Sequence, residues 1–208
     1  MYPFVESVKF QNGQFFNLES HQERFDYTRL IHYPEEPRVD LASVLKQSPD
    51  LLPGQIYKCR IIYGKEIGDI IYEPYVPRQI RQYYLVVCPD GLDYSFKSID
   101  RKFFDEARKK LRPDEDYIYV RNGLITDTSF ANLVFADDEN YYTPSSPLLK
   151  GTKRSLYLKT GRIKEAEIRV RDLTRFRSFF IVNAMLDIGD TSVFSCDKLL
   201  LSHNFPKL

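Results

Sequence analysis

The sequence predicts an α+β fold built from two domains, and three observations predict it. Apolar and polar residues alternate from Phe4 to Phe10, and an Asn12-Gly13 turn leads into a returning strand, so the chain opens on a β-hairpin. Apolar residues at helical spacing follow this hairpin. The second half carries short apolar runs separated by turn residues, which is typical of an antiparallel meander.

Composition limits the possible partners. The 208 residues are 43% apolar, enough to bury one sizeable core or two modest ones. Lys plus Arg number 30 and Asp plus Glu number 29, so the net charge gives no reason to expect nucleic acid or an anionic membrane as main partner. The three cysteines lack CxxC spacing and a nearby histidine cluster, so we expect no metal and a reducing cytoplasm. We recognise neither a signal peptide nor a membrane-spanning stretch.

The first half predicts two helices and two further strands. The helix after the hairpin has Asn17 as its expected N-cap and carries Arg24. A second helix is expected to begin at Asp40 and to end at Pro49 or Pro53. Strands rich in β-branched and aromatic residues are expected at residues 56–63 and 67–72.

A stiff connector separates the predicted domains. Pro74 and Pro77 stand close together in the segment EPYVPRQ, which favours an extended backbone. We therefore expect an N-terminal domain over residues 1–77 and a C-terminal domain over residues 78–208.

The second half alternates strands with two helices. Lys97 is expected at the end of a short extended piece, directly before a helix over residues 99–111. Asp127 is expected directly after the strand that follows the Asn122-Gly123 turn. A helix over residues 152–159 is expected to open at Gly151. The expected strands cover residues 83–88, 116–120, 124–126, 132–136, 141–143, 166–173 and 178–183, with a turn or short helix around Thr174.

Three motifs in a fixed order, FKSIDR, ITDTSFAN and TPSSPLLKGTKR, suit the parts of one cofactor. Lys97 has aromatic neighbours whose desolvation would lower its pKa and leave a nucleophilic amine, although a single lysine is by default a solvated surface residue. Asp127 either caps a local turn or holds the proton on a pyridine nitrogen. Together they indicate pyridoxal 5'-phosphate.

The third motif supplies an anion seat. Backbone amides after Gly151, from Thr152 and Lys153, stand at a helix start where the helix dipole attracts phosphate, although a plain glycine cap has the same pattern. Arg24 could add a forked contact to the phosphate, or could be an ordinary surface residue.

With these motifs in order, the chain resembles the class IV, or fold-type IV, family of pyridoxal-phosphate enzymes. That family includes branched-chain and D-amino-acid aminotransferases and 4-amino-4-deoxychorismate lyases. Six segments resemble motifs of that family, in the same order. They are Phe4–Ser7 (the FET-like strand), His21–Arg24 (HxxR), Lys97–Arg101 (KxxNR), Thr126–Asn132 (TExSxxN), Thr143–Arg154 (TP followed by LxGxxR) and Asn183–Met185 (the late Asn turn). The resemblance covers nearly the whole chain.

The resemblance implies roles for individual residues. Lys97 would hold the cofactor as a Schiff base and move protons, and Asp127, where the family usually has Glu, would pair with the pyridine nitrogen. The remaining cofactor contacts would come from Arg24, Gly151, Thr152, Lys153, Asn183 and Ala184. The resemblance also implies a small α/β domain, a larger β-barrel-like domain, and a homodimer acting on an amino-acid-like substrate.

The segment from Lys97 to Arg101 ranks the candidate activities. Branched-chain aminotransferases carry Tyr five residues after the lysine, whereas this chain has Lys102. We therefore expect a 4-amino-4-deoxychorismate lyase, which releases pyruvate and forms 4-aminobenzoate for folate synthesis. A branched-chain or D-amino-acid aminotransferase is the alternative. A non-catalytic relative that keeps the fold is a further alternative.

Overall fold

The computed structural model describes residues 3–46 and 51–200, and its contacts divide the chain into two compact units. The first unit comprises Met1–Val76 and Phe96–Asp100, and the second comprises Pro77–Ser95 and Arg101–Leu208. The division at Val76 falls inside the proline-containing connector. A domain boundary between residues 77 and 78 stays a prediction. The segment around Lys97 packs with the first unit, although it lies beyond that boundary in the chain.

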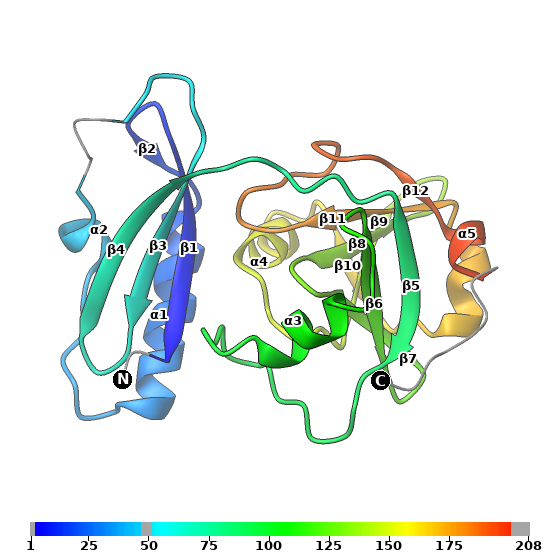
Figure 1. Ribbon diagram of the computed structural model, residues 1–208, viewed down its shortest axis with the longest axis horizontal. Coiled ribbons are helices and arrows are strands. Elements are labelled where there is room, and N and C mark those ends of the chain that lie inside the picture. The colour runs from blue at the N-terminus through cyan, green and yellow to red at the C-terminus, as the bar shows by residue number, and fades with distance from the viewer. Residues whose placement is uncertain (1–2, 47–50, 201–208) are drawn as a thin grey trace. The chain divides into compact units, whose positions relative to one another are not determined.

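The first unit is a four-stranded sheet in the order β2-β1-β3-β4, with α1 and α2 (Figure 1). Its elements are β1 (Phe4–Gln11), β2 (Gln14–Phe15), α1 (Leu18–His32), α2 (Leu41–Val44), β3 (Tyr57–Tyr63) and β4 (Ile67–Pro74). The predicted hairpin is confirmed, because Asn12 and Gly13 adopt φ angles of 50° and 81°, the pair of positive values that a type I′ turn requires. Both strand predictions that follow are also confirmed.

Of the two helix predictions in the first unit, the N-cap at Asn17 is confirmed and the second helix needs correction. Asn17 precedes α1 as expected, but it adopts a left-handed conformation, and its side chain makes no cap bond within the described residues. The helix expected from Asp40 is a single turn, capped by Asp40 and followed by an extended Leu45. One turn already buries Leu41 and Leu45, so no longer helix is needed. Of the two expected ends, Pro49 lies outside the described residues, and Pro53 lies in a turn beyond the end of α2.

Phe25 stands at the centre of the first unit's core. Its ring is fully buried and lies 4.6 Å from the ring of Tyr63, centroid to centroid. The other buried members of this core are Phe4, Val8, Leu41, Leu45, Cys59, Ile61 and Tyr63. The apolar spacing of α1 thus places its buried face on the sheet.

We expect Phe25→Ala to lower the free energy of unfolding by about 3–5 kcal/mol, because it removes a buried ring and leaves a cavity. Leu30→Ala on the same helix is the control, since Leu30 is 64% exposed and its loss should change stability by less than about 0.5 kcal/mol. Urea denaturation measures both variants. Equal losses would contradict this description of the core.

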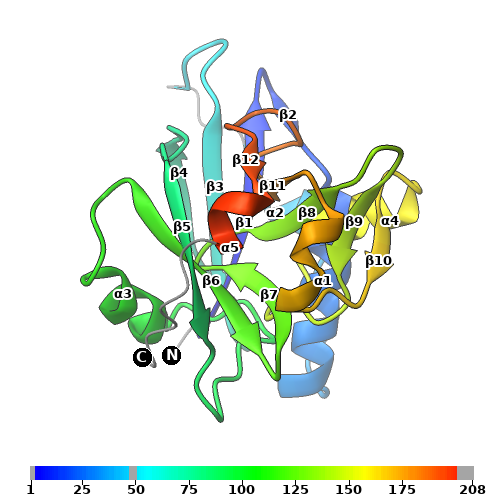
Figure 2. The same ribbon diagram turned by 90° about the vertical axis from the view of Figure 1, so that its right-hand side faces the viewer.

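The second unit contains an eight-stranded sheet, in which β10-β9-β8-β7-β6-β5 follow in order and β11 pairs with β8 and β12. Figure 2 brings β12 and α5 to the front of this sheet. Its elements are β5 (Gln82–Val87), α3 (Lys102–Arg108), β6 (Glu115–Arg121), β7 (Leu124–Thr128), β8 (Asn132–Ala136), β9 (Tyr141–Pro144), α4 (Thr152–Lys159), β10 (Lys164–Ala166), η1 (Val170–Arg175), β11 (Ser178–Val182), β12 (Phe194–Ser195) and α5 (Cys196–Leu200). The predicted antiparallel meander is β6 to β9, and α4 has the predicted bounds.

The segment around Lys97 was predicted wrongly in one respect. The helix expected over residues 99–111 is α3, which begins only at Lys102. Ile99 N donates to Pro3 O at 2.9 Å, and Val5 N donates to Lys97 O at 3.0 Å. These bonds hold the segment extended along the start of β1, so the helix can begin only after residue 99.

Two further corrections concern the second unit. Asp127 lies inside β7 rather than after a strand. The strand expected over residues 166–173 is mostly absent from the described chain, where β10 ends at Ala166 and the 3₁₀ helix η1 begins at Val170. Asp172 Oδ2 accepts the Arg169 backbone N–H at 3.1 Å, and such local side-chain bonds favour a turn over a strand.

Overall, the α+β fold with a smaller and a larger sheet is confirmed. None of the described helices combines the length and the hydropathy that a membrane crossing needs.

Candidate functional site

The second unit fixes one buried acid, Asp127. Its side chain is 5% exposed, and its Oδ1 and Oδ2 accept hydrogen bonds from Asn132 Nδ2 at 2.7 Å and from Leu149 N at 2.9 Å. Burial raises the pKa of Asp127 to about 6, against the lowering effect of these bonds. With this pKa the carboxyl is mostly charged near pH 7. Because both hydrogen-bond donors are neutral, a cationic ligand atom would stabilise that charge.

Asn132 ties this acid to the start of α4. Its Nδ2 also donates to Leu149 O at 2.9 Å. A Cβ built on Gly151 would lie only 2.0 Å from Asn132 Oδ1, so glycine is required by close packing. The φ of Gly151 is −69°, which any residue can adopt, so the backbone conformation does not explain why this residue is glycine.

The first turn of α4 has the chemistry of an anion seat. Gly151 is the N-cap and has no side chain with which to satisfy the first amides of the helix. Thr152 and Lys153 follow and are 2% and 6% exposed. Lys153 Nζ binds Asp187 Oδ1 at 2.7 Å, so the ammonium is directed to that acid, and the backbone amide is the part of Lys153 suited to a phosphate.

Asn183 forms a turn that is bonded to the loop after Asp127. Its Oδ1 accepts from Met185 N at 2.9 Å and Leu186 N at 3.1 Å, and its Nδ2 donates to Phe130 O at 3.4 Å. Ala184 lies within this turn and is half-buried. Hydrogen bonds therefore link the Asn183 turn to the segment that carries Asp127 and Asn132.

The other two predicted residues, Lys97 and Arg24, belong to the first unit. Lys97 is half-buried, and its carbonyl accepts the Val5 amide. Arg24 makes a forked ion pair with buried Glu6, from Nε to Oε1 at 2.9 Å and from Nη2 to Oε2 at 2.6 Å. The prediction that Arg24 and Lys97 contact one cofactor with the second-unit residues stays a prediction.

Sequence reasoning missed three residues that bond to predicted site residues or to segments next to them in the chain. Asn132 and Glu6 stood inside motifs that were quoted only as patterns. Arg101, at the end of FKSIDR, donates to Tyr94 Oη at 2.7 Å and to Ser129 O at 2.5 Å. It thereby binds the chain that follows the Lys97 segment to the loop after Asp127. The signal for all three was their polar type at fixed motif positions.

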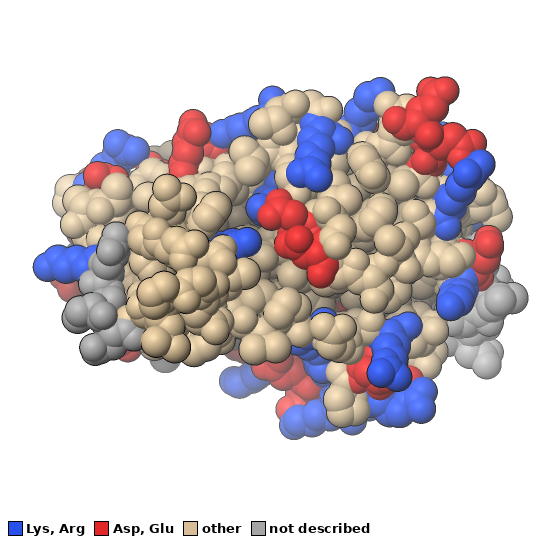
Figure 3. All heavy atoms as spheres, turned by 90° about the horizontal axis from the view of Figure 1, so that it is seen from above, with Lys and Arg blue, Asp and Glu red and all other residues tan. Residues whose placement is uncertain are grey.

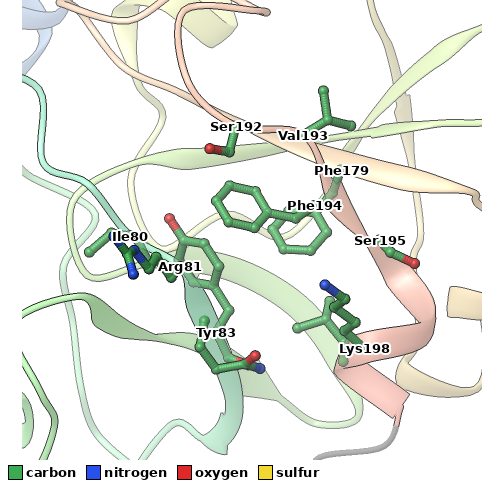
Figure 4. Close-up of a pocket in the computed structure, with 11 residues that line it drawn as sticks. Ile80, Arg81, Tyr83, Phe179, Ser192, Val193, Phe194, Ser195 and Lys198 are labelled. Atoms are coloured by element: carbon green, nitrogen blue, oxygen red, sulfur yellow. The ribbon is translucent and has the colours of Figure 1, made fainter.

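A separate pocket of about 240 Å³ lies elsewhere in the second unit (Figure 4). Tyr83, Phe179 and Phe194 form an aromatic wall, with Lys198 of α5 at one side. Among the described residues that line it, none is assigned to the cofactor by the sequence motifs. This pocket therefore contributes nothing to the candidate site.

Charged side chains form no metal site in the described part of the chain, where no group of three or more His, Cys, Asp or Glu is placed to hold an ion. Basic and acidic side chains are interspersed on the face shown in Figure 3. This face therefore carries no broad patch of a single charge.

We expect Gly151→Ala to destabilise the protein by about 1–3 kcal/mol, because the added methyl group must displace Asn132. Thermal or urea unfolding measures the loss. The double variant Gly151→Ala/Asn132→Ala removes the clashing amide and should unfold no more easily than Asn132→Ala alone. An equal penalty in both backgrounds would show that Asn132 is not the cause.

A buried acid and a nearby helix start with a glycine N-cap are the chemistry that a phosphorylated ligand with a basic ring nitrogen requires. The family model described as amino-transferase class IV matches residues 4–192 of this chain. The chain therefore belongs to the class IV aminotransferase family and is a pyridoxal-phosphate-dependent enzyme.

Individual relatives support this membership. An uncharacterised protein of Haemophilus influenzae is 34% identical over 187 residues, which cover 89% of this chain and 98% of that protein. A crystal structure from Haemophilus somnus 129PT, described as a candidate 4-amino-4-deoxychorismate lyase, is 30% identical with a TM-score of 0.79 and covers 89% of this chain and 97% of its own. A hypothetical aminotransferase of Mycobacterium tuberculosis, with α-ketoglutarate and PMP bound, has a TM-score of 0.69 at 18% identity, with 99% of this chain and 83% of that one covered, and is similar in fold.

Proposed function

We propose that this protein is a pyridoxal-phosphate-dependent 4-amino-4-deoxychorismate lyase that releases pyruvate and forms 4-aminobenzoate for folate synthesis. The observation that carries the cofactor part of the proposal is the buried Asp127 carboxylate, fixed by Asn132 and Leu149 next to the Gly151 turn. The candidate lyase of Haemophilus somnus, which is similar over nearly its whole length, supports this activity over the alternatives.

The residues present fit pyridoxal phosphate by their chemistry. Lys97 is assigned the covalent attachment, Asp127 the pyridine nitrogen, and Arg24 the phosphate. The amides of Thr152 and Lys153 at the start of α4 add further phosphate contacts. Gly151, Asn183 and Ala184 shape the backbone around the cofactor.

When bound, the cofactor supplies an electron-withdrawing ring that stabilises negative charge at the substrate Cα. The chain's own residues do the rest. Asp127 keeps the ring nitrogen protonated through its negative charge. Lys97 would be the base that accepts the substrate Cα proton at Nζ. The bond between the substrate ring and the enolpyruvyl oxygen would break as the ring becomes aromatic, and the leaving group would take up the proton from Lys97 Nζ to become pyruvate.

The decisive experiment supplies purified, cofactor-loaded protein with aminodeoxychorismate and measures pyruvate and 4-aminobenzoate in equal amounts. A parallel assay supplies branched-chain or D-amino acids with 2-oxoglutarate. Formation of both lyase products supports the proposal. Turnover only in the second assay would replace it with an aminotransferase, and turnover in neither, without cofactor uptake, would indicate a non-catalytic relative.

The family resemblance also supports a homodimer that acts in the cytoplasm on a small amino-acid-like substrate. Light scattering after size-exclusion chromatography should give twice the mass of one chain. A monomeric mass at the concentration of the activity assay would contradict the dimer.

A further inference from the structure

Strand β1 of the first unit carries a buried acid, Glu6, that contacts two residues of α1. Glu6 is fully buried, and both of its oxygens accept from Arg24, at 2.9 Å from Nε and 2.6 Å from Nη2. His21 Nδ1 lies 2.6 Å from Glu6 Oε2. His21 and Arg24 are one helical turn apart, so the same acid fixes both.

Charge explains why this cluster is rigid. Burial by itself would raise the pKa of Glu6, but Arg24 and His21 lower it to about 2, so Glu6 is ionised at any physiological pH. Burial lowers the pKa of His21, which is therefore neutral near pH 7 and donates from Nδ1 to the carboxylate. Breaking the buried ion pair would leave an uncompensated charge, which is strongly unfavourable.

The fork has a directional consequence for Arg24. A guanidinium is planar, and Glu6 takes the edge formed by Nε and Nη2. The opposite edge therefore faces away from Glu6, in an orientation that the ion pair determines. An arginine held in this way loses little side-chain entropy when it binds an anion.

The same strand also holds Lys97. Val5, the neighbour of Glu6, donates its amide to Lys97 O at 3.0 Å, and Phe4 pairs with Ser98. Lys97 also acts electrostatically on His21 and lowers its pKa, so the lysine and the cluster lie within range of each other in the first unit. Strand β1 thus contacts the backbone of Lys97 through Val5 and the side chain of Arg24 through Glu6.

We infer that Glu6 is a positioning residue that fixes the orientation in which Arg24 binds the cofactor phosphate, with His21 fixing the second oxygen of Glu6. The inference rests on the proposed function, in which Arg24 binds phosphate. Glu6 itself, being an anion, does not contact the phosphate. Its effect on cofactor binding passes through Arg24.

The test compares the affinities of the protein for pyridoxal 5'-phosphate and for pyridoxal, which lacks the phosphate, by spectroscopic titration. Glu6→Gln keeps the size of the side chain and removes its charge. We expect it to lower the ratio of the two affinities about 10-fold or more, since a charge-assisted contact is lost. A merely structural defect would weaken both ligands alike and leave the ratio unchanged, which would overturn the inference.

Two further variants make the outcomes separable. Arg24→Gln should lower the same ratio, and Glu6→Gln should have no added effect on it in the Arg24→Gln background, where no buried charge is left unpaired. If Arg24→Gln leaves the ratio intact, the phosphate role in the proposed function fails. If Arg24→Gln lowers it but Glu6→Gln does not, only the present inference fails. The matched control is Asp26→Asn on α1, which weakens an exposed ion pair with Arg38 and should leave the ratio unchanged.

Discussion

Replacing Lys97 by Ala is expected to abolish the visible absorption of the loaded enzyme and to lower turnover by roughly 10³-fold or more. The variant loses the amine that attaches the cofactor and also the base that moves the Cα proton, a role worth about 10²–10⁴-fold on its own. Absorption spectra before and after borohydride reduction, together with the lyase assay, measure both losses.

Two controls separate covalent attachment from charge. Lys97→Arg keeps a positive charge but lacks a nucleophilic amine, so it should be as inactive as Lys97→Ala. Lys110→Ala removes an exposed lysine from the same region of the sequence and should behave like the wild type. Cofactor that stays attached to Lys97→Ala through denaturation after borohydride reduction would assign the attachment to another lysine.

Replacing Asp127 by Asn should lower turnover by roughly 10²-fold or more, in line with the loss of one preorganised electrostatic partner. The variant keeps the size of the side chain but can no longer hold a proton on the ring nitrogen by charge. Steady-state kinetics with saturating cofactor measure the effect. Asp127→Glu restores the acid that the family usually carries and should retain most of the activity.

The pKa of Asp127 adds a pH dependence to this prediction. In the cofactor-free protein the carboxyl has a pKa of about 6, raised by burial, so it becomes neutral as pH falls through that value. Its contribution to stability is therefore present at low pH and is lost as pH rises through about 6. Cofactor affinities of wild type and Asp127→Asn should converge at about pH 5 and differ at about pH 8, and a difference independent of pH would contradict the charge argument.

Much of the fold was predictable because its signals are local. The Asn12-Gly13 and Asn122-Gly123 turns specify hairpins by their positive φ angles, and Gly151 followed by a helical run gave the bounds of α4. The failures have tertiary causes. Helical propensity after Lys97 was overridden by backbone bonds from Ile99 and Val5.

The residues of the candidate site likewise fall into those that local signals predict and those that only tertiary contacts identify. Lys97, Asp127 and Gly151 could be named from residue type and motif order, but their supporting residues could not. Asn132 matters because its amide bonds both Asp127 and Leu149 and occupies the space that a Cβ on Gly151 would need, and Leu149 and Gly151 are 17 or more residues further along the chain. Glu6 becomes informative only when β1 and α1 pack together.

By itself, the sequence determined the family, the cofactor class and the order of the secondary-structure elements from β1 to α4, because motifs, turns and apolar periodicity are local properties of the chain. The tertiary structure alone decided which neighbours fix the acid, how the arginine is oriented, and that the Lys97 segment extends along β1. The physical reason is that burial, ion pairing and close packing depend on residues that only folding brings into contact.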